Sequence, residues 1–378
     1  MRKIPYFIPD ITKVERDAIT NVLDNPSYDI VSELEDEFKK FIGIEYAVAT
    51  LSGAAAFHLC LFAMDIKRGD KIICSVNCHP MFPEMIRHFD AEPIFVDIEE
   101  DTFFMSYEKC KETIESMGVK KLRAIIVSHT AGQAMDLEPF FALANTYNIK
   151  IIEDATMALG LTHNGVKIGS QQTFASIFNI VLDATHPVAQ TGILTTHDEE
   201  LARQAVLLRY HGIVSEKTKT TSASLQYLYD VVGIGNKYNV SYLDVALCLS
   251  QLRRIDYIIQ RRIEIAQYYN ATLKDAPHIE IPIVKSDHIF LHYIIKLDKN
   301  RDHFAKKLKE CGIQVALHFV PSHLLTYYKG KYKYKISDFP IALKNYQQIL
   351  SLPIYSAMQQ EDMDYVCKQV LHLTNSRV

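Results

Sequence analysis

Residues that can bind an anion or transfer a proton follow several short apolar runs in this sequence. Ser52 and Gly53 follow one run, His129 follows another, and Glu153 and Asp154 end a third. Amides at a helix start bind anions, and histidine exchanges a proton near neutral pH. If the runs are parallel strands, these residues meet at the carboxyl edge of one sheet, where open α/β sheets bind ligands.

Each of these residues also has an ordinary structural interpretation. Ser52-Gly53 suits either an anion or a plain capping turn, and the two interpretations are evenly matched. Glu153 and Asp154 are adjacent and point to opposite faces of a strand, so only one of them enters a cleft. His129 is an acid/base candidate, although a histidine with satisfied hydrogen bonds is the commoner case.

The cysteines indicate reduced thiols rather than a disulfide framework or a metal centre. There are seven, an odd number, at scattered positions. Cys74, Cys78 and His79 lie close together, but a metal site needs a fourth ligand and a tighter pattern. We therefore predict no metal site and a cytoplasmic location.

Composition is that of a globular protein. The chain has 378 residues, with 41 Lys and Arg against 45 Asp and Glu, a net charge of −4, and 48% hydrophobic residues. A near-neutral charge argues against a nucleic-acid partner, which needs a dominant basic field. No apolar run is long enough to cross a bilayer, so no membrane partner is expected.

Apolar runs alternate with segments of helical periodicity as far as residue 240. This alternation predicts right-handed βαβ units and a mostly parallel sheet with helices on both faces. A helical stretch follows, with four arginines on its polar side, and then a small α+β lobe. The expected domains are 1–240 and 241–378. The expected strands are 46–51, 71–74, 93–97, 124–128, 150–154, 175–178, 192–196, 292–296 and 314–319. The expected helices are 34–42, 54–64, 82–89, 137–147, 241–273, 301–311 and 361–371. The four arginines are Arg253, Arg254, Arg261 and Arg262.

Several short motifs, in order along nearly the whole chain, resemble the DegT/DnrJ/EryC1/StrS family of nucleotide-sugar aminotransferases. The motifs are Ile4-Pro5-Tyr6, Leu51-Ser52-Gly53-Ala54-Ala55-Ala56, Pro93-Ile94-Phe95-Val96-Asp97, His129-Thr130-Ala131-Gly132, Glu153-Asp154-Ala155 with Ala158 and Gly160, Arg209-Tyr210-His211-Gly212, Gln251-Leu252 with Arg261-Arg262, His318-Phe319-Val320-Pro321-Ser322-His323 and Ser351-Leu352-Pro353-Ile354-Tyr355.

The resemblance implies a pyridoxal-phosphate (PLP) transferase fold like that of aspartate aminotransferase. Such a fold has a mostly parallel seven-stranded sheet between helices and a smaller C-terminal α+β lobe. It also implies a homodimer with shared sites and a nucleotide-linked sugar as substrate. Asp154 matches the partner of the pyridinium nitrogen, and His79 matches the ring that stacks on PLP. His318 and His323 lie in the substrate-lobe motif.

The cofactor-binding positions depart from the family pattern. The lysine that forms the Schiff base with PLP falls at Ala184, and no lysine occurs between Lys167 and Lys217. Around it, other contacts have also changed. The phosphate-binding turn Gly53, Ala54, Ala55 lacks its hydroxyl at Ala54, the upstream serine is Asn179, the residue beside the phenolic oxygen is Met157, and the segment that reaches the partner's phosphate carries Lys237.

Three functions remain open. The first is a non-transaminating family member that either retains sugar-nucleotide binding or serves as a partner or regulator of an active paralogue. The second is an active enzyme on nucleotide keto-sugars, either an aminotransferase or an enzyme similar to the family's 3-dehydratases, with PLP or PMP (the amine form of the cofactor) held noncovalently and His186 or Asp183 as base. The third is a cofactor-free sugar-processing enzyme. The cofactor is accordingly noncovalent PLP or PMP, or none.

Overall fold

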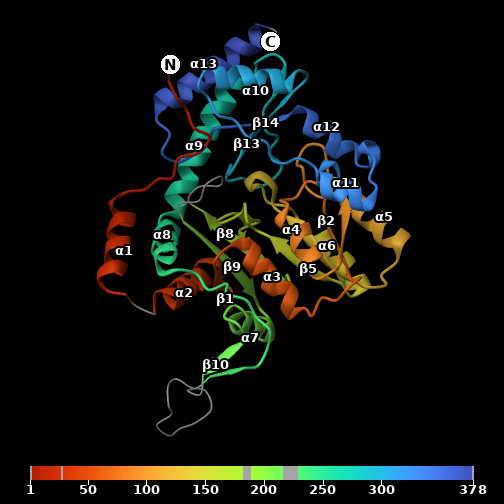
Figure 1. The fold of residues 1–378 in the computed structure, drawn as a ribbon. Helices are drawn as coiled ribbons and strands as arrows, with labels where there is room; N and C mark the ends of the chain where they lie inside the picture. The colour runs from red at the N-terminus through yellow and green to blue at the C-terminus, as the bar shows by residue number, and fades with distance from the viewer. Residues whose placement is uncertain (1, 27–28, 182–188, 216–228, 377–378) are drawn as a thin grey trace.

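The computed structural model describes residues 2–26, 29–181, 189–215 and 229–376. A seven-stranded sheet forms its centre, in the order β1-β9-β8-β5-β4-β2-β3 (Figure 1). β9 is antiparallel to both neighbours, and the other pairs are parallel, so the predicted mostly parallel sheet is confirmed. The strands are β1 (Tyr46–Thr50), β2 (Lys71–Ser75), β3 (Glu92–Val96), β4 (Leu122–Ser128), β5 (Lys150–Asp154), β8 (Ala175–Val181) and β9 (Gln190–Thr196).

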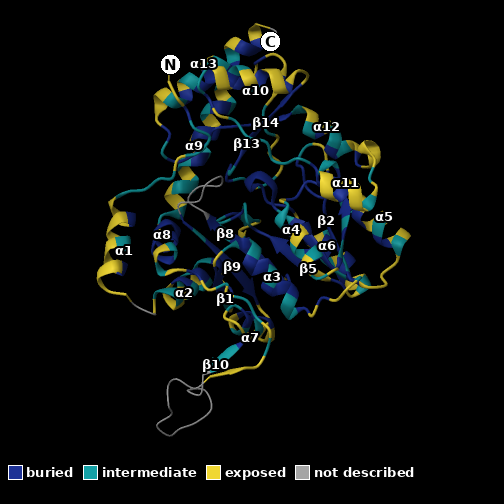
Figure 2. Cartoon of the chain, viewed as in Figure 1, coloured by how far each residue is buried: buried dark blue, intermediate teal, exposed yellow. Residues whose placement is uncertain are grey.

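Helices cover both faces of this sheet because its side chains are apolar on both faces. Neighbouring strand residues separate cleanly: Ile72 packs with Phe82 of one helix layer, and Ile73 packs with Phe140 of the other. Figure 2 shows the strands buried and the outer helix surfaces exposed. One layer is α3 (Gly53–Ala63), α4 (Met81–His88) and α7 (Glu199–Leu208). The other is α2 (Ile30–Ile42), α5 (Tyr107–Met117), α6 (Glu138–Tyr147) and α8 (Tyr242–Leu252).

A second, antiparallel sheet has its own core with the later helices (Figure 1). The N-terminal segment joins this core, because Ile4 donates to Gly312 O and accepts from Gln314 N. The elements are β12 (Ile279–Glu280), β13 (Tyr293–Leu297), β14 (Ile349–Leu352), α9 (Ile255–Leu273), α10 (Arg301–Glu310), α11 (Thr326–Tyr332), α12 (Pro340–Gln348) and α13 (Gln360–Asn375).

The remaining elements are short or peripheral. In the described part of the chain, two small hairpins and three 3₁₀ turns connect the larger elements, and α1 packs against α8. Within the described residues, no helix has the length and apolar character needed to span a membrane. The elements are α1 (Lys13–Asp24), β6 (Thr162–His163), β7 (Val166–Lys167), β10 (Ile213–Ser215), β11 (Tyr229–Val231), η1 (Thr130–Gly132), η3 (Ser322–Leu324) and η4 (Ile336–Asp338).

Three expectations for residues 241–378 are wrong. The segment 314–319 is not a strand: single bridges tie Ile313 to Ile4 and Ala316 to Ser351, and the third strand of the small sheet is β12. The helical stretch 241–273 is divided between α8 and α9 at Arg253 and Arg254. Arg262 is not on the polar side of this stretch but is buried. The domain boundary at residue 240 stays a prediction.

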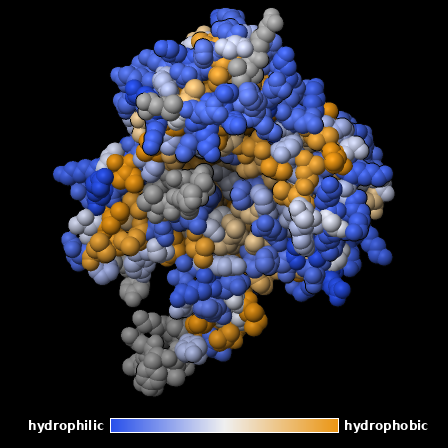
Figure 3. All heavy atoms as spheres, turned by 45° about the horizontal axis from the view of Figure 1, so that its top comes forward, coloured by the Kyte–Doolittle hydropathy of each residue, from blue (hydrophilic) through white to orange (hydrophobic). Residues whose placement is uncertain are grey.

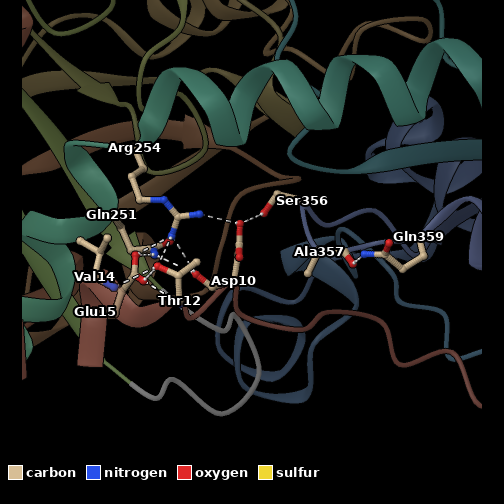
Figure 4. A network of polar contacts seen from close by, with 9 residues as sticks. All are labelled: Asp10, Thr12, Val14, Glu15, Gln251, Arg254, Ser356, Ala357 and Gln359. Atoms are coloured by element: carbon tan, nitrogen blue, oxygen red, sulfur yellow. Dashed lines mark hydrogen bonds and ion pairs between the residues drawn. The ribbon is translucent and has the colours of Figure 1, made fainter. Parts of the chain in front are cut away.

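A polar network fixes α1 to the start of α9 (Figure 4). The buried Glu15 carboxylate accepts hydrogen bonds from Thr12 N at 2.7 Å, Thr12 Oγ1 at 2.6 Å, Gln251 Nε2 at 2.7 Å and Arg254 Nη1 at 2.7 Å. Arg254 Nη2 also donates to Asp10 at 3.0 Å. Burial opposes ionisation of Glu15, but the bonds from Thr12 and Arg254 outweigh it and lower its pKa to about 2.

We predict that Glu15→Gln lowers the free energy of unfolding by about 2–3 kcal/mol, because Arg254 loses a buried counter-charge. The contribution of Glu15 is full above its unfolded pKa of 4.5 and is lost as the pH falls towards 2. Urea unfolding at pH 7 and pH 3 measures both effects. Glu33→Gln, which breaks an exposed pair with Arg253, is the control and should cost less than about 1 kcal/mol. Equal losses in the two variants would contradict the prediction.

Candidate functional site

A cleft of about 500 Å³ lies at the carboxyl edge of the large sheet, where sequence reasoning places the ligand. Its walls come from the start of α3, the loops after β2 and β5, the strands β8 and β9, the helix α9, and the N-terminal segment. The lining residues are Tyr6, Phe7, Ser52, Gly53, Ala54, His79, Met81, Thr156, Met157, Asn179, Gln190, Arg262, Leu291, His292, His318, Phe319 and Ile354.

The first amides of α3 are bound by side chains of this protein. Ser52 Oγ accepts from Ala55 N at 3.2 Å, which makes Ser52 the N-cap. Gly53 N donates to Asn179 Oδ1 at 3.3 Å. A Cβ at position 53 would lie 3.3 Å from Asn179 Cβ, so the two residues are in close contact. Asn179 Oδ1 therefore accepts the hydrogen bond that Gly53 N could otherwise donate to an anion at this helix start.

The adjacent carboxylates have separate surroundings. Glu153 is fully buried, where His129 Nε2 lies 2.9 Å from Oε1 and Ser176 donates to Oε2. His129 Nδ1 accepts from Met135 N at 2.9 Å, so its Nε2–H is the donor to Glu153. His129 is thus a structural histidine that ties the ends of β4 and β5 together. The acid/base alternative has no support from these contacts.

Asp154 ends β5 beside the cleft rather than on its wall. Its Oδ1 accepts from Thr156 N at 3.1 Å and Thr156 Oγ1 at 2.6 Å. Burial raises the pKa of Asp154, and the bonds from Thr156 oppose that rise. Asp154 interacts electrostatically with His79, whose own pKa is lowered by burial against the opposing effect of the carboxylates of Asp154 and Glu84. His79 Nδ1 accepts from Met81 N at 3.2 Å, and its ring meets Phe319 edge to face.

A row of aromatic and imidazole groups forms the opposite wall. His292 and His318 stack with ring centroids 3.6 Å apart and an interplanar angle of 13°. Tyr6 Oη lies 2.9 Å from His292 Nδ1, and Ser351 Oγ lies 2.8 Å from His318 Nδ1. Burial and repulsion from His79 lower the pKa of His318 to about 4, and burial also holds the pKa of His292 well below its usual range. Both rings are therefore neutral at pH 7.

Other residues chosen from the sequence are distributed more widely. Gly53, Ala54, Met157 and Asn179 line the cleft, and Ala55 lies just behind as a buried residue of α3. Lys237 is exposed and pairs through its backbone with Tyr210, away from the cleft wall. His323 is also not brought to the cleft, because it is buried beside Phe339 with Nε2 3.2 Å from Ile336 O. Asp183, Ala184 and His186 lie outside the described residues.

Sequence reasoning missed several polar residues of this cleft, among them Tyr6, His292 and Arg262. Tyr6 and Arg262 were present in the family-like motifs, which was the available signal. His292 begins an expected strand and gave no sign of function. The long sequence separation of these residues from β5 and α3 explains the omission, because local pattern does not report which distant segments meet.

Comparisons with known proteins identify the family to which this chain belongs. A sequence profile of the DegT/DnrJ/EryC1/StrS aminotransferase family matches residues 9–371. The spore coat polysaccharide biosynthesis protein SpsC of Bacillus subtilis is 32% identical over 378 residues, covering 97% of this chain and 96% of SpsC. This chain belongs to the DegT/DnrJ/EryC1/StrS aminotransferase family. An uncharacterized protein of Methanocaldococcus jannaschii is 31% identical over 373 residues, which is 95% of each chain.

Solved structures confirm the predicted fold of this family member. A putative sugar aminotransferase from Streptococcus pneumoniae, in its PMP form, has a TM-score of 0.91 at 23% identity and covers 100% of both chains. PseC of Helicobacter pylori, an aminotransferase involved in the biosynthesis of pseudoaminic acid, has a TM-score of 0.87 at 21% identity, covering 99% of this chain and 100% of PseC. The PLP-transferase fold is therefore established.

The described residues of this family member do not fit covalently bound PLP. No lysine is found among the described residues that line the cleft, and the sequence has none between Lys167 and Lys217. At the start of α3, where the family binds the phosphate, Gly53 N already donates a hydrogen bond to Asn179 Oδ1. Ala54 has no hydroxyl that could donate to a phosphate. His79 and Asp154 remain as matches to the ring-binding positions. The described lining residues thus offer neither a lysine for a Schiff base nor a hydroxyl at Ala54 for a phosphate.

We predict that His318 makes the folded protein less stable as the pH falls from 6.5 towards 4. The pKa of this imidazole is 6.5 in the unfolded state and about 4 in the folded state, so the unfolded state binds the proton first as the pH falls. The resulting loss is on the order of 2 kcal/mol between pH 7 and pH 5. His318→Gln should therefore flatten the pH dependence of urea unfolding in this range. His303→Gln, on the exposed face of α10, is the matched control. An unchanged slope in His318→Gln would contradict a neutral buried ring.

Proposed function

We propose that this protein is a non-transaminating member of the sugar aminotransferase family that binds a nucleotide-linked sugar in the cleft. The observation that carries the proposal is the contact between Asn179 Oδ1 and Gly53 N, together with the absence of any lysine from 168 to 216. None of the described residues that line the cleft is a lysine, so none of them can anchor PLP covalently or supply the amine that moves the proton at the reacting carbon.

The changed phosphate end supports the same conclusion energetically. Hydrogen bonds to a charged group contribute about 1.5–3 kcal/mol each. A phosphate at the start of α3 would have to displace Asn179 from Gly53 N and would find a methyl group at Ala54. Losing two such bonds lowers affinity by roughly 10²–10⁴-fold. Retained cofactor would therefore be held weakly and noncovalently.

The cleft is suited to a polar, uncharged part of a ligand such as a sugar ring. Its volume of about 500 Å³ is in the range of small-molecule sites. Neutral donors and acceptors line it: Tyr6, His292, His318 and Gln190. Family membership supports a sugar ligand, and SpsC is described as a polysaccharide biosynthesis protein. The nucleotide link is part of the proposal.

One observation favours a second candidate, a dehydratase-like enzyme with noncovalent PLP or PMP. His79 lines the cleft and Asp154 is close enough to influence its protonation, as expected if a cofactor ring sits between these groups. The base would then be His186 or Asp183. Saturable, noncovalent PLP binding with turnover of a nucleotide sugar would favour this candidate over the first.

We also propose that the protein forms a homodimer through the region of β11. Apolar side chains are unusually exposed there: Tyr229 at 68%, Val231 at 51%, Val232 at 52% and Ile234 at 83%. Figure 3 shows hydrophobic atoms gathered on this part of the surface. Large exposed apolar patches mark association sites in proteins. The exposed Lys237 belongs to the same segment and would then face the partner subunit.

One prediction of the proposed function concerns the cofactor. The wild-type protein, incubated with PLP and reduced with borohydride, should give no saturable pyridoxyl adduct by mass spectrometry. Ala184→Lys alone should not transaminate with L-glutamate, because Asn179 and Ala54 still oppose phosphate binding. The matched variant combines Ala184→Lys with Asn179→Ser and Ala54→Thr and should bind PLP at least tenfold more tightly than the single variant. A saturable wild-type adduct, at Lys237 for example, or full activity of Ala184→Lys, would overturn the proposal.

Another prediction concerns the proposed homodimer. Light scattering after size exclusion should give twice the chain mass of 43.2 kDa at micromolar concentration. Ile234→Asp should shift the protein to the monomer, since a charge would be buried in the interface. Val166→Asp, at an exposed valine of β7, should leave the dimer intact. A wild-type monomer would contradict the proposal.

A further inference from the structure

Arg262 is a buried, charged residue in the wall of the cleft. It belongs to α9 and is only 7% exposed. It lines the main cleft and also an adjoining cavity of about 100 Å³, so it lies where the two spaces meet. Burial lowers its pKa to about 10, which still leaves the guanidinium protonated at neutral pH.

Only one nitrogen of this guanidinium is used by the described part of the protein. Nη1 donates to Leu291 O at 3.0 Å and to Ile354 O at 3.4 Å, and the group lies over the Phe7 ring at 5.7 Å. These contacts hold the guanidinium in place. No described residue accepts a hydrogen bond from Nε or Nη2, the pair of donors that matches a carboxylate or phosphate.

The neighbouring arginines behave differently, because each has a carboxylate partner. Arg253 pairs with Glu37, Arg254 with Glu15 and Asp10, and Arg261 with Glu264. Asp10 also lines the smaller cavity, but it is already bound by Arg254. Among the described residues, no carboxylate lies within ion-pair distance of Arg262, the most buried of the four arginines.

An unpaired buried charge costs several kcal/mol, so its counter-ion is expected from elsewhere. We infer that the Nε–Nη2 edge of Arg262 binds an anionic oxygen group of the ligand, the sugar carboxylate or the diphosphate of a nucleotide-linked sugar. This inference rests on the proposed function for the ligand class. If Arg262 only held α9 in place, the hydrogen bonds from Nη1 to Leu291 O and Ile354 O would be enough, and Nε and Nη2 would have no function.

The surroundings limit the ligand to one anionic group at this point. His292 and His318 are neutral near pH 7, and burial raises the pKa of Tyr6, so these neighbours add no charge of their own. Tyr6 and the two imidazoles can hydrogen-bond hydroxyl groups beside the anion. Arg262 would therefore set the orientation of the ligand, with its charge inward and its hydroxyls along the imidazole wall.

The test measures binding by calorimetry for the full chain with UDP-glucose, UDP-glucuronate and inorganic phosphate at pH 7.5. The variants are Arg262→Met, which removes the charge, and Arg262→Lys, which keeps the charge but loses the paired donors. Arg261→Met, one residue away, is the matched control, and circular dichroism checks the fold. If Arg262→Met fails to fold, the Arg262→Lys variant carries the comparison. We expect at least a tenfold loss of affinity in both Arg262 variants and none in Arg261→Met.

The outcomes are distinct. A loss confined to UDP-glucuronate assigns the sugar carboxylate to Arg262, and an equal loss for both sugars assigns the diphosphate. Unchanged affinities in the Arg262 variants overturn the inference while leaving the proposed function intact. The wild type could also bind phosphate in an Arg262-dependent way but neither UDP-sugar. That result would support the anion site at Arg262 and contradict the proposed binding of a UDP-linked sugar. Absence of all binding overturns both.

Discussion

The candidate site depends on a steric constraint where three strands meet the first turn of α3. Thr50, Gly192 and Asn179 lie opposite one another across β1, β9 and β8. A Cβ on Gly192 would lie 2.0 Å from the backbone carbon of Ser52, so only glycine allows this approach. Since α3 follows β1 almost directly, the register that places Gly192 there also places Asn179 against Gly53. One close backbone contact thus decides which side chain faces the helix start.

This arrangement changes the distribution of charge in the cleft. The positive end of α3, which commonly binds phosphate, is satisfied by the neutral Asn179 amide. The imidazoles of His292 and His318 are neutral because they are buried and stacked together. Among the described residues that line the cleft, the positive charge at neutral pH is that of Arg262 in α9. The anionic group of the proposed ligand would therefore be drawn towards Arg262 of α9 rather than towards the start of α3.

Much of the fold was predictable because its signals are local. Apolar strands such as 150–154 and a capped helix after Ser52 can be recognised within a few residues. The segment 314–319 was misleading because its alternation comes from residues that line a connection, with His318 and Phe319 facing the cleft. Arg262 was misplaced because its charge suggested a solvent-facing position, whereas its hydrogen bonds are made to distant carbonyls. The contacts of Tyr6 with His292 span 286 residues, which no local pattern reports.

The residues that form the hydrophobic cores are largely different from the residues that line the cleft, so the lining can vary without loss of the fold. The hydrophobic clusters around Phe82, Phe140 and Tyr269 involve few of the residues that line the cleft. The Glu15 network ties α1 to α9 outside the main cleft and needs no ligand. Removing a lysine from a cleft wall removes a buried amine rather than a structural contact, and it lowers the cost of desolvating charge. Under the proposed function, the sheet, the cleft and Arg262 would therefore be sufficient to hold an anionic sugar ligand without a covalent cofactor.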